Sequence, residues 1–272
     1  METMKSARKN ETGDVGSDLS EQIKAATKVN HVRAENTQLM LSYQKGQITL
    51  PQYKVLLFSL YEIYKALEEE LDRNSSHPAV APIYFPQELA RLEALEADLE
   101  HFFGVNWRKM VIVPSATHRY EQRLRKIGKE SPELLVAHAY TRYLGDLSGG
   151  QVLGKITQKS LGLSSKGGLS FFTFPGVTSP NRFKQLYRSR MNSIELTEEE
   201  KEEVLKEAVA AFEFNIQVFD DLQKMLSVTR EAVDQPEPSA VRTSIFTFSP
   251  IMQFTVGVCV ALTTIGMGLY AL

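Results

Sequence analysis

The chain has a single cysteine, a net charge close to zero and no sustained alternation of apolar and polar residues. Because that cysteine, Cys259, lies in an apolar C-terminal segment, the rest of the chain has no disulfide framework, thiolate metal site or catalytic thiol. This cysteine usage is typical of a reducing, cytosolic environment. The formal net charge of −2, from 31 basic and 33 acidic residues, gives no support for nucleic-acid binding. The lack of alternation and of hairpin turns argues against a β-sheet.

Common cofactor and catalytic motifs are missing too. The sequence contains no G-x-G-x-x-G, P-loop or G-x-S-x-G motif, so a redox cofactor would have to bind by another route. Four histidines lack a metal-like spacing such as H-E-x-x-H, and we expect surface or hydrogen-bonded core positions for His77, His101, His118 and His138. The acidic runs at residues 68–70 and 198–200 are interpreted as solvated helix faces.

Helical patterns fill the chain between residues 18 and 226, which predicts an all-α domain. Asp18 followed by Glu21 is typical of a helix start, and so is Thr197 before three glutamates. Sustained helices are expected over residues 19–41, 53–73, 86–104, 140–156 and 197–226.

Composition separates this domain from both ends of the chain. Residues 1–17 are polar and are expected to be a disordered tail, residues 18–228 form the helical domain, and residues 229–250 are a proline-containing linker. Residues 251–272 carry no charge over 22 positions, which is long enough to span a bilayer core of about 30 Å. We predict a C-terminal transmembrane helix that anchors the domain on the cytosolic side. A buried core helix is the alternative.

The predicted helix from Tyr140 to Ile156 is unusual because it contains four glycines. An interior helical glycine costs about 1 kcal/mol relative to alanine, so the pattern indicates a bend or the close approach of a ligand. At about 100° per residue one arc of this helix carries a guanidinium, a carboxylate and bare backbone. A flat ligand is predicted to lie against that arc, which comprises Arg142, Gly145, Asp146, Gly149 and Gly150.

Two further groups of residues indicate an anionic ligand that carries a metal. A narrow stripe on the first helix consists of Lys24, Lys28, His31 and Glu35. A carboxylate one turn from a histidine can orient the ring of a metal ligand, and lysines suit a carboxylate-bearing ligand. The alternative is a solvated charged face. Lys184 and Arg188 form a second basic pair four residues apart, which is either a second anion-binding wall or part of an ordinary surface helix.

Taken together, segments such as ATKVNHVRAEN, YLGDLSGGQ and FKQLYRSRMN resemble heme oxygenase. The resemblance covers residues 18–226 and the C-terminal anchor, and the YLGDLSGGQ run in an all-helical chain is its most specific part. It implies one multi-helix domain that holds heme b between a proximal and a kinked distal helix. It also implies oxidative cleavage of heme at the α-meso carbon to biliverdin, CO and ferrous iron. The chain is most similar to the inducible form, since the cysteine-proline motifs of the constitutive form are absent.

The resemblance assigns roles residue by residue. It makes His31 the proximal ligand of the heme iron, oriented by Glu35, and Asp146 the distal carboxylate that holds a proton-supplying water network. Gly145 and Gly149 become the positions where the distal helix crosses the heme. The polar members of the distal network would be Arg142, Tyr64 and Asn215. The propionate contacts would be Lys24, Lys28, Tyr140, Lys184 and Arg188.

The resemblance also implies partners and a location. The expected co-substrate is O2, and electrons are expected from NADPH through NADPH-cytochrome P450 reductase, with biliverdin reductase as a further partner. The location implied is the endoplasmic reticulum membrane; a homo-oligomer is left open and no nucleic acid is expected. Two rival readings remain. One is a heme-binding sensor or carrier without turnover, and the other is a tail-anchored helical adaptor for protein partners.

Overall fold

The computed structural model describes residues 18–163 and 167–233. The predicted tail at residues 1–17 and the predicted membrane span at residues 251–272 lie outside these ranges, as does most of the predicted linker. The chain divides into two compact units, Met1–Val228 and Thr229–Leu272. Among the described residues, no helix is both long and apolar enough to cross a bilayer.

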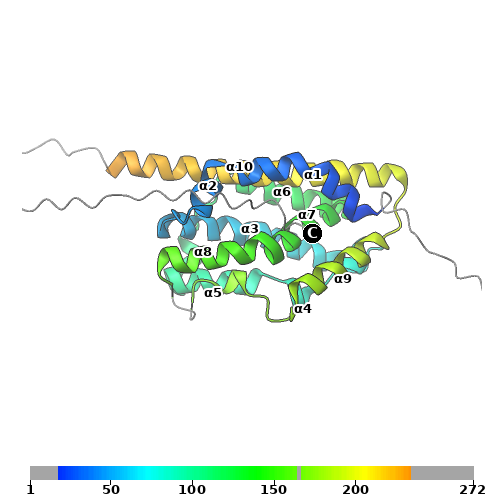
Figure 1. Cartoon of the computed structure of the whole chain (residues 1–272), viewed down its shortest axis with the longest axis horizontal. Helices are drawn as coiled ribbons and strands as arrows, with labels where there is room; N and C mark the ends of the chain where they lie inside the picture. The colour runs from blue at the N-terminus through cyan, green and yellow to red at the C-terminus, as the bar shows by residue number, and fades with distance from the viewer. Residues whose placement is uncertain (1–17, 164–166, 234–272) are drawn as a thin grey trace, which may run out of the picture. The chain divides into compact units, whose positions relative to one another are not determined.

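Helices make up all the regular structure of the described ranges, which confirms the predicted all-α class (Figure 1). The α-helices are α1 (Leu19–Glu35), α2 (Gln38–Gln44), α3 (Leu50–Arg73), α4 (Pro86–Leu89), α5 (Leu92–Phe103), α6 (Ser115–Glu130), α7 (Leu135–Gly145), α8 (Gln151–Leu161), α9 (Pro180–Asn192) and α10 (Glu198–Val233). A π-helical segment, η4 (Asp146–Gly150), joins α7 to α8. Short 3-10 turns are η1 (Ala81–Ile83), η2 (Trp107–Lys109), η3 (Pro132–Leu134) and η5 (Ser170–Phe172).

Helix α3 is the centre of the packing. A capping box between Thr49 and Gln52 starts it, and buried side chains then recur on all of its sides, Leu57, Tyr64 and Leu67 among them. In Figure 1 it lies between a layer that contains α1 and α10 and a layer that contains α5 and α8. Because α3 packs against α5, α6 and α7, any side chain it contributes to a site is held firmly in place.

The expected single helix over residues 86–104 is interrupted by a carboxylate from α3. Glu68 accepts hydrogen bonds from the backbone N–H groups of Arg91 at 2.6 Å and Leu92 at 3.2 Å, and so starts α5 as a separate helix. Burial raises the pKa of Glu68 to about 7. Glu70 is also fully buried and pairs with Arg73. The prediction that residues 68–70 form a solvated face is therefore wrong.

One other local expectation was incorrect: the pattern over residues 19–41 forms α1 and α2, separated at Asn36 and Thr37. The helix start predicted at Asp18 is confirmed, since Asp18 is the N-cap residue of α1, although its side chain makes no capping hydrogen bond. Thr197 does cap α10, since its hydroxyl accepts the backbone N–H of Glu200 at 3.2 Å. The run at residues 198–200 is exposed, as expected.

One predicted core histidine has a complete set of partners. His138 is fully buried, with Nε2 at 2.8 Å from Glu207 Oε1 and Nδ1 at 3.1 Å from the Tyr120 hydroxyl. Arg123 Nε donates to the same carboxylate at 3.0 Å. Burial would raise the pKa of Glu207, but the hydrogen bonds from His138 and Arg123 outweigh it and lower that pKa to about 2. This cluster ties α6, α7 and α10 together.

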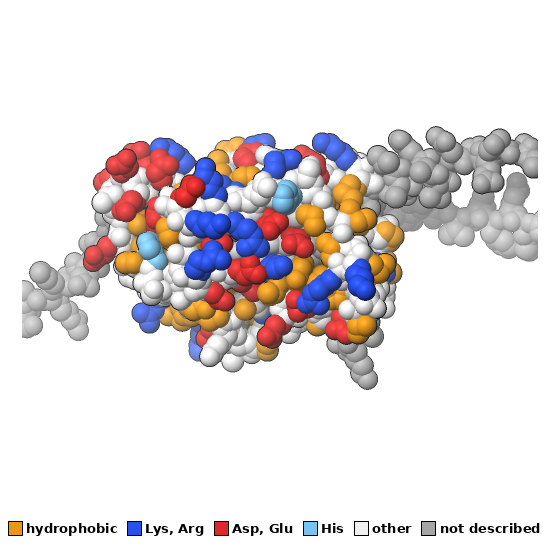
Figure 2. Space-filling model, turned by 180° about the vertical axis from the view of Figure 1, so that it is seen from behind, with side chains coloured by type: hydrophobic (Ala, Val, Ile, Leu, Met, Phe, Trp, Pro, Cys, Tyr) orange, Lys and Arg blue, Asp and Glu red, His pale blue; other side chains and the backbone are white. Residues whose placement is uncertain are grey.

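Acidic and basic side chains are mixed over the outside of the domain. On the face shown in Figure 2, Lys and Arg side chains gather near the centre with Asp and Glu between and around them. Arg125 is one example, since it contacts Glu121 at 2.9 Å and Glu69 at 2.8 Å. Pairing of this kind keeps any one sign of charge from dominating that face.

Replacing Glu207 by glutamine is expected to lower the free energy of unfolding at pH 7 by about 3 kcal/mol. The folded pKa of Glu207, about 2, lies below the ordinary value of about 4.3 for an unfolded chain. Its stabilisation is therefore present above the unfolded value and is lost as the pH falls toward 2. Urea denaturation of Glu207→Gln and wild type between pH 3 and pH 7 measures this difference. If the difference in the free energy of unfolding between the two proteins does not shrink as the pH falls, the prediction is contradicted. The control is Glu203→Gln, an exposed position on the same helix.

Candidate functional site

The glycine-bearing helix is a continuous helical rod that widens in the middle. Helix α7 ends at Gly145, the π-helical turn runs from Asp146 to Gly150, and α8 follows without a loop. A π turn closes its hydrogen bonds over five residues instead of four, so the backbone is locally wider than in an α-helix. The glycine-rich part of the predicted helix therefore forms a π turn, which is a common site of helix kinks.

The four glycines of this rod have different surroundings. A Cβ atom at Gly145 or Gly149 would meet no other atom within 4 Å beyond its own helix backbone, and both residues are exposed. Gly150 is buried, and its Cβ would lie 3.5 Å from that of Asp146. The predicted arc was therefore too wide, because a π turn rotates less than 100° per residue. Gly154 packs tightly, since a Cβ there would come within 2.8 Å of the Phe172 ring.

The polar residues predicted for the distal network come together beside this turn. The Tyr64 hydroxyl donates a hydrogen bond to Asp146 Oδ2. Arg142 Nε donates to the Tyr64 hydroxyl at 3.3 Å, and Arg142 Nη1 donates to Asn215 Oδ1 at 2.5 Å. Three helices, α3, α7 and α10, thus meet around one carboxylate and one guanidinium.

Burial sets the acidity of this group. It raises the pKa of Asp146 above its ordinary range, although the positive charge of Arg142 and the hydrogen bond from Tyr64 act in the opposite direction. Burial likewise raises the pKa of Tyr64 well above 10. A carboxyl that keeps its proton to a higher pH than usual is suited to hold and release protons.

The network extends farther than the sequence indicated. Burial raises the pKa of Tyr120 to about 12, with a hydrogen bond to Asn215 acting against it. Tyr120 in turn contacts His138, and His138 contacts Glu207. No sequence signal identified this extension, because its members are far apart in the chain and each looks like an ordinary core residue.

On the proximal side, His31 and Glu35 lie together as their spacing predicts. His31 Nδ1 is 3.6 Å from Glu35 Oε2, and both side chains are about half exposed. Phe212 of α10 meets the imidazole edge-on at 5.7 Å between ring centroids. A carboxylate near Nδ1 leaves Nε2 to face a metal. In the described ranges no three His, Cys, Asp or Glu side chains gather as a metal centre would need.

The basic residues are less tightly grouped than predicted. Lys184 is buried, and its ammonium donates to Ser148 Oγ of the π turn at 2.9 Å. Burial and then the nearby Arg188 lower the pKa of Lys184. Arg188 and Tyr140 are half-buried. On α1, Lys24 lies 3.8 Å from Glu21 and Lys28 is exposed.

Two helices connect the proximal helix to the distal one. On α10, Phe212 contacts His31 and Asn215, one turn later, contacts Arg142. On α9, Lys184 contacts the π turn, and Asn192 accepts the backbone N–H of Ser20 in α1 at 2.9 Å. These contacts of α9 and α10 fix the separation of the proximal helix α1 from the distal helix formed by α7 and α8, which are the two walls of the candidate site. The sequence alone did not identify Phe212, Ser148 or Asn192 as site residues. For Ser148 a signal was present, because this residue lies in the glycine-rich part of the distal helix.

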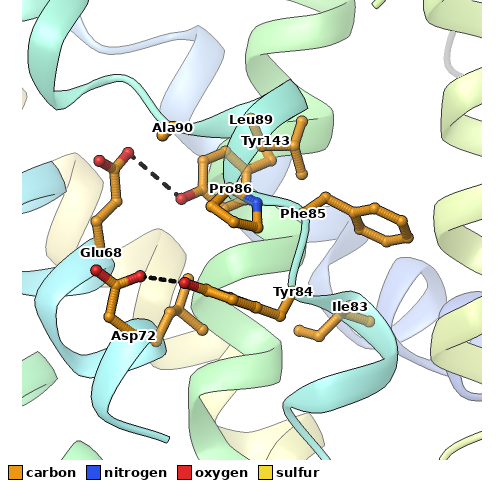
Figure 3. A pocket seen from close by; sticks show the side chains of 10 residues that line it. Glu68, Asp72, Ile83, Tyr84, Phe85, Pro86, Leu89, Ala90 and Tyr143 are labelled. Carbon is orange, nitrogen blue, oxygen red and sulfur yellow. Dashed lines mark hydrogen bonds between the residues drawn. The ribbon is translucent and has the colours of Figure 1, made fainter. Parts of the chain in front are cut away.

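A small cavity lies beside Tyr143 of the distal helix. It has a volume of about 100 Å³ and is lined by α3, residues 83–90 and Tyr143 (Figure 3). The Tyr143 hydroxyl donates to Glu68 at 3.4 Å, and the Tyr84 hydroxyl donates to Asp72 at 2.6 Å. This cavity is separate from the His31 and Asp146 residues.

Comparison with known proteins gives one consistent result. A family profile described as heme oxygenase matches residues 17–221. The chain is 63% identical to a heme oxygenase of Takifugu rubripes over 262 residues, which cover 94% of this chain and 95% of that protein. It is 54% identical to heme oxygenase 1 of Homo sapiens over 219 residues, 80% of this chain and 75% of that protein. The structure of a cyanobacterial heme oxygenase-1 from Synechocystis, in complex with heme, superposes with a TM-score of 0.73 at 38% identity, covering 79% of this chain and 99% of that one.

The surroundings of two glycines predict opposite effects of one substitution. Gly145→Ala should raise the free energy of unfolding by about 0.5–1 kcal/mol, because the methyl group meets open space in a helix. Gly154→Ala should lower it by about 1–3 kcal/mol, because the methyl group overlaps Phe172. Chemical denaturation of both variants without ligand tests the pair. Destabilisation by Gly145→Ala as large as by Gly154→Ala would show that the outer face of the π turn is packed.

Proposed function

Because the chain belongs to the heme oxygenase family and is a heme-degrading enzyme, we propose that it cleaves heme at the α-meso carbon. The proposed products are biliverdin, CO and ferrous iron. The proposed co-substrates are O2 and electrons supplied by NADPH-cytochrome P450 reductase. Heme is both substrate and cofactor in this reaction, since its iron activates the oxygen that opens its own ring.

The residues present fit a heme. His31 offers Nε2 while Glu35 lies near Nδ1, and Gly145 and Gly149 leave the distal backbone uncovered. A flat macrocycle needs such a face, since a side chain at either glycine would hold it away from the helix. Lys184 and Arg188 are proposed to bind propionates from α9, with Tyr140, Lys24 and Lys28 as further contacts, and so to fix the rotation of the ring.

The observation that carries the proposal is the half-buried Asp146 with its partners. Tyr64 and Arg142 orient the carboxylate from two other directions, and Asn215 holds Arg142. We propose that Asp146 holds ordered water on the distal side and passes protons to it. A proton supplied through water, instead of by an acid in direct contact, favours attack on the ring over cleavage of the O–O bond.

The rival reading as a heme-binding sensor or carrier makes no use of this arrangement. Binding alone requires His31, a flat face and the basic residues. A buried carboxylate with a raised pKa costs stability, because ionising it in the interior is unfavourable. An adaptor without heme would need neither set of residues. An enzyme that degrades heme would use both the heme-binding residues and the Asp146 network.

We further propose that the chain is anchored in the endoplasmic reticulum membrane through residues 251–272, with the helical domain in the cytosol. The support is the uncharged length of that segment. Biliverdin reductase is the proposed acceptor of the product. Whether copies of the chain associate in the membrane is left open.

Turnover of the heme complex with reductase and NADPH tests the enzyme reading. Wild type should lose its Soret band and form biliverdin. Asp146→Ala should bind hemin within about threefold of wild type, yet form biliverdin at least 100-fold more slowly, in line with the loss of a general acid. Glu198→Ala, on the exposed first turn of α10, is the control and should behave as wild type.

Hemin titration separates binding from turnover. His31→Ala should remove the Soret shift expected of a histidine-ligated iron, and imidazole should restore it in part. An unchanged shift in His31→Ala would reject the proximal assignment. Normal biliverdin formation by Asp146→Ala would reject the distal one, and a persistent Soret band in wild type would favour the carrier.

The proposed propionate contacts predict a change in regiospecificity. The double variant Lys184→Gln and Arg188→Gln removes both charges and should convert a single α isomer into a mixture in which other isomers exceed about 10%. Chromatography of the biliverdin isomers measures this ratio independently of the rate. Arg182→Gln, exposed on the same helix, is the matched control. A pure α isomer from the double variant would place the propionates elsewhere.

A further inference from the structure

The connection between α5 and α6, residues 104–113, exposes a cluster of apolar side chains. The exposed fractions are 74% for Val105, 53% for Met110, 62% for Ile112 and 37% for Val113. Four large apolar residues exposed within nine positions are uncommon on a soluble surface, and such clusters mark contact with a partner or a membrane. The proposed heme site makes no use of them.

The loop is held in shape by its own tryptophan. Trp107 is 1% exposed and meets the Tyr61 ring edge-on at 4.7 Å. Arg108 stacks over the outer side of Trp107 at 4.4 Å and pairs with Glu96 at 2.5 Å. Trp107 and the half-buried Val111 supply the inward-facing apolar side chains of this loop. The four exposed apolar side chains therefore remain outside a position that is already filled.

The loop also lies near the place where the chain leaves the domain. Directly after it, the Ser115 hydroxyl and the Ala116 backbone N–H donate to Asp221 Oδ2 of α10 at 3.0 and 2.9 Å. The first compact unit ends at Val228, seven residues and roughly 10 Å of helix farther on. Seventeen residues, 234–250, then precede the uncharged segment. A segment of that length reaches at most about 60 Å when fully extended.

We propose that residues 104–113 rest on the surface of the bilayer, with Val105, Met110, Ile112 and Val113 at the boundary between headgroups and acyl chains. The exposed Lys109 favours anionic headgroups, while the charge of Arg108 is offset by Glu96. This proposal rests on the proposed membrane anchor. The anchor holds the domain near the bilayer, and the loop fixes which side of the domain faces it.

Depth-dependent quenching in the full chain tests the contact. In a Cys259→Ser background, Ile112→Cys is labelled with an environment-sensitive fluorophore and the chain is reconstituted in phosphatidylcholine–phosphatidylserine vesicles. Brominated lipids should quench the label at least twofold. The control is Leu186→Cys, a 42% exposed apolar position on α9, a helix outside the proposed contact surface. Its label should be quenched by less than about 10%.

The outcomes separate the loop from the anchor. If the chain floats with the vesicles but the label at position 112 is not quenched, the loop contact is overturned and the anchor stands. If the chain does not float, the anchor fails and the loop contact fails with it. If lipid does not quench that label but added reductase shields it, the loop is a protein interface and the bilayer proposal is wrong. Weaker quenching by Lys109→Glu would support the contribution of anionic lipid.

Discussion

The arrangement of the site depends on the buried guanidinium of Arg142. It donates to Tyr64 on α3 and to Asn215 on α10, and it compensates the charge of Asp146 within its own helical rod. A buried carboxylate without such a partner would be strongly destabilising. Removing the guanidinium would leave Asn215 Oδ1 without its donor and the Tyr64–Asp146 pair without a compensating positive charge. The guanidinium of Arg142 therefore helps to set both the relative positions of three helices and the acidity of the Asp146 carboxyl.

The second constraint is the fixed separation of the proximal and distal walls. Helix α10 meets His31 through Phe212 and Arg142 through Asn215, while α9 contacts both walls through Asn192 and Lys184. Since Phe212 and Asn215 lie one turn apart on a single rigid helix, a shift of one wall is transmitted to the other. His31 and Asp146 are thereby kept in a constant relation, as a preorganised site requires.

The sequence predicted features that depend on spacing within one helix. His31 and Glu35 are four residues apart and lie together, and Thr197 caps α10. The sequence-based prediction was wrong where the burial of a residue depends on a segment that is far away in the chain. Glu68 resembles a solvated residue by periodicity, yet the chain at Arg91 folds over it. Gly150 was misplaced because the width of a π turn arises from hydrogen bonding that composition does not reveal.

The open faces of Gly145 and Gly149 have a consequence for cooperative unfolding. The inner side of this rod is packed through Leu144 and Leu147, but its outer face has no side chain at these two positions that resists local opening of the π turn. A ligand seated against it would add the missing contacts and raise the free energy of that opening. Amide hydrogen exchange between α7 and α8 would then report occupancy of the site, and the substrate itself completes the folding of the wall that acts on it.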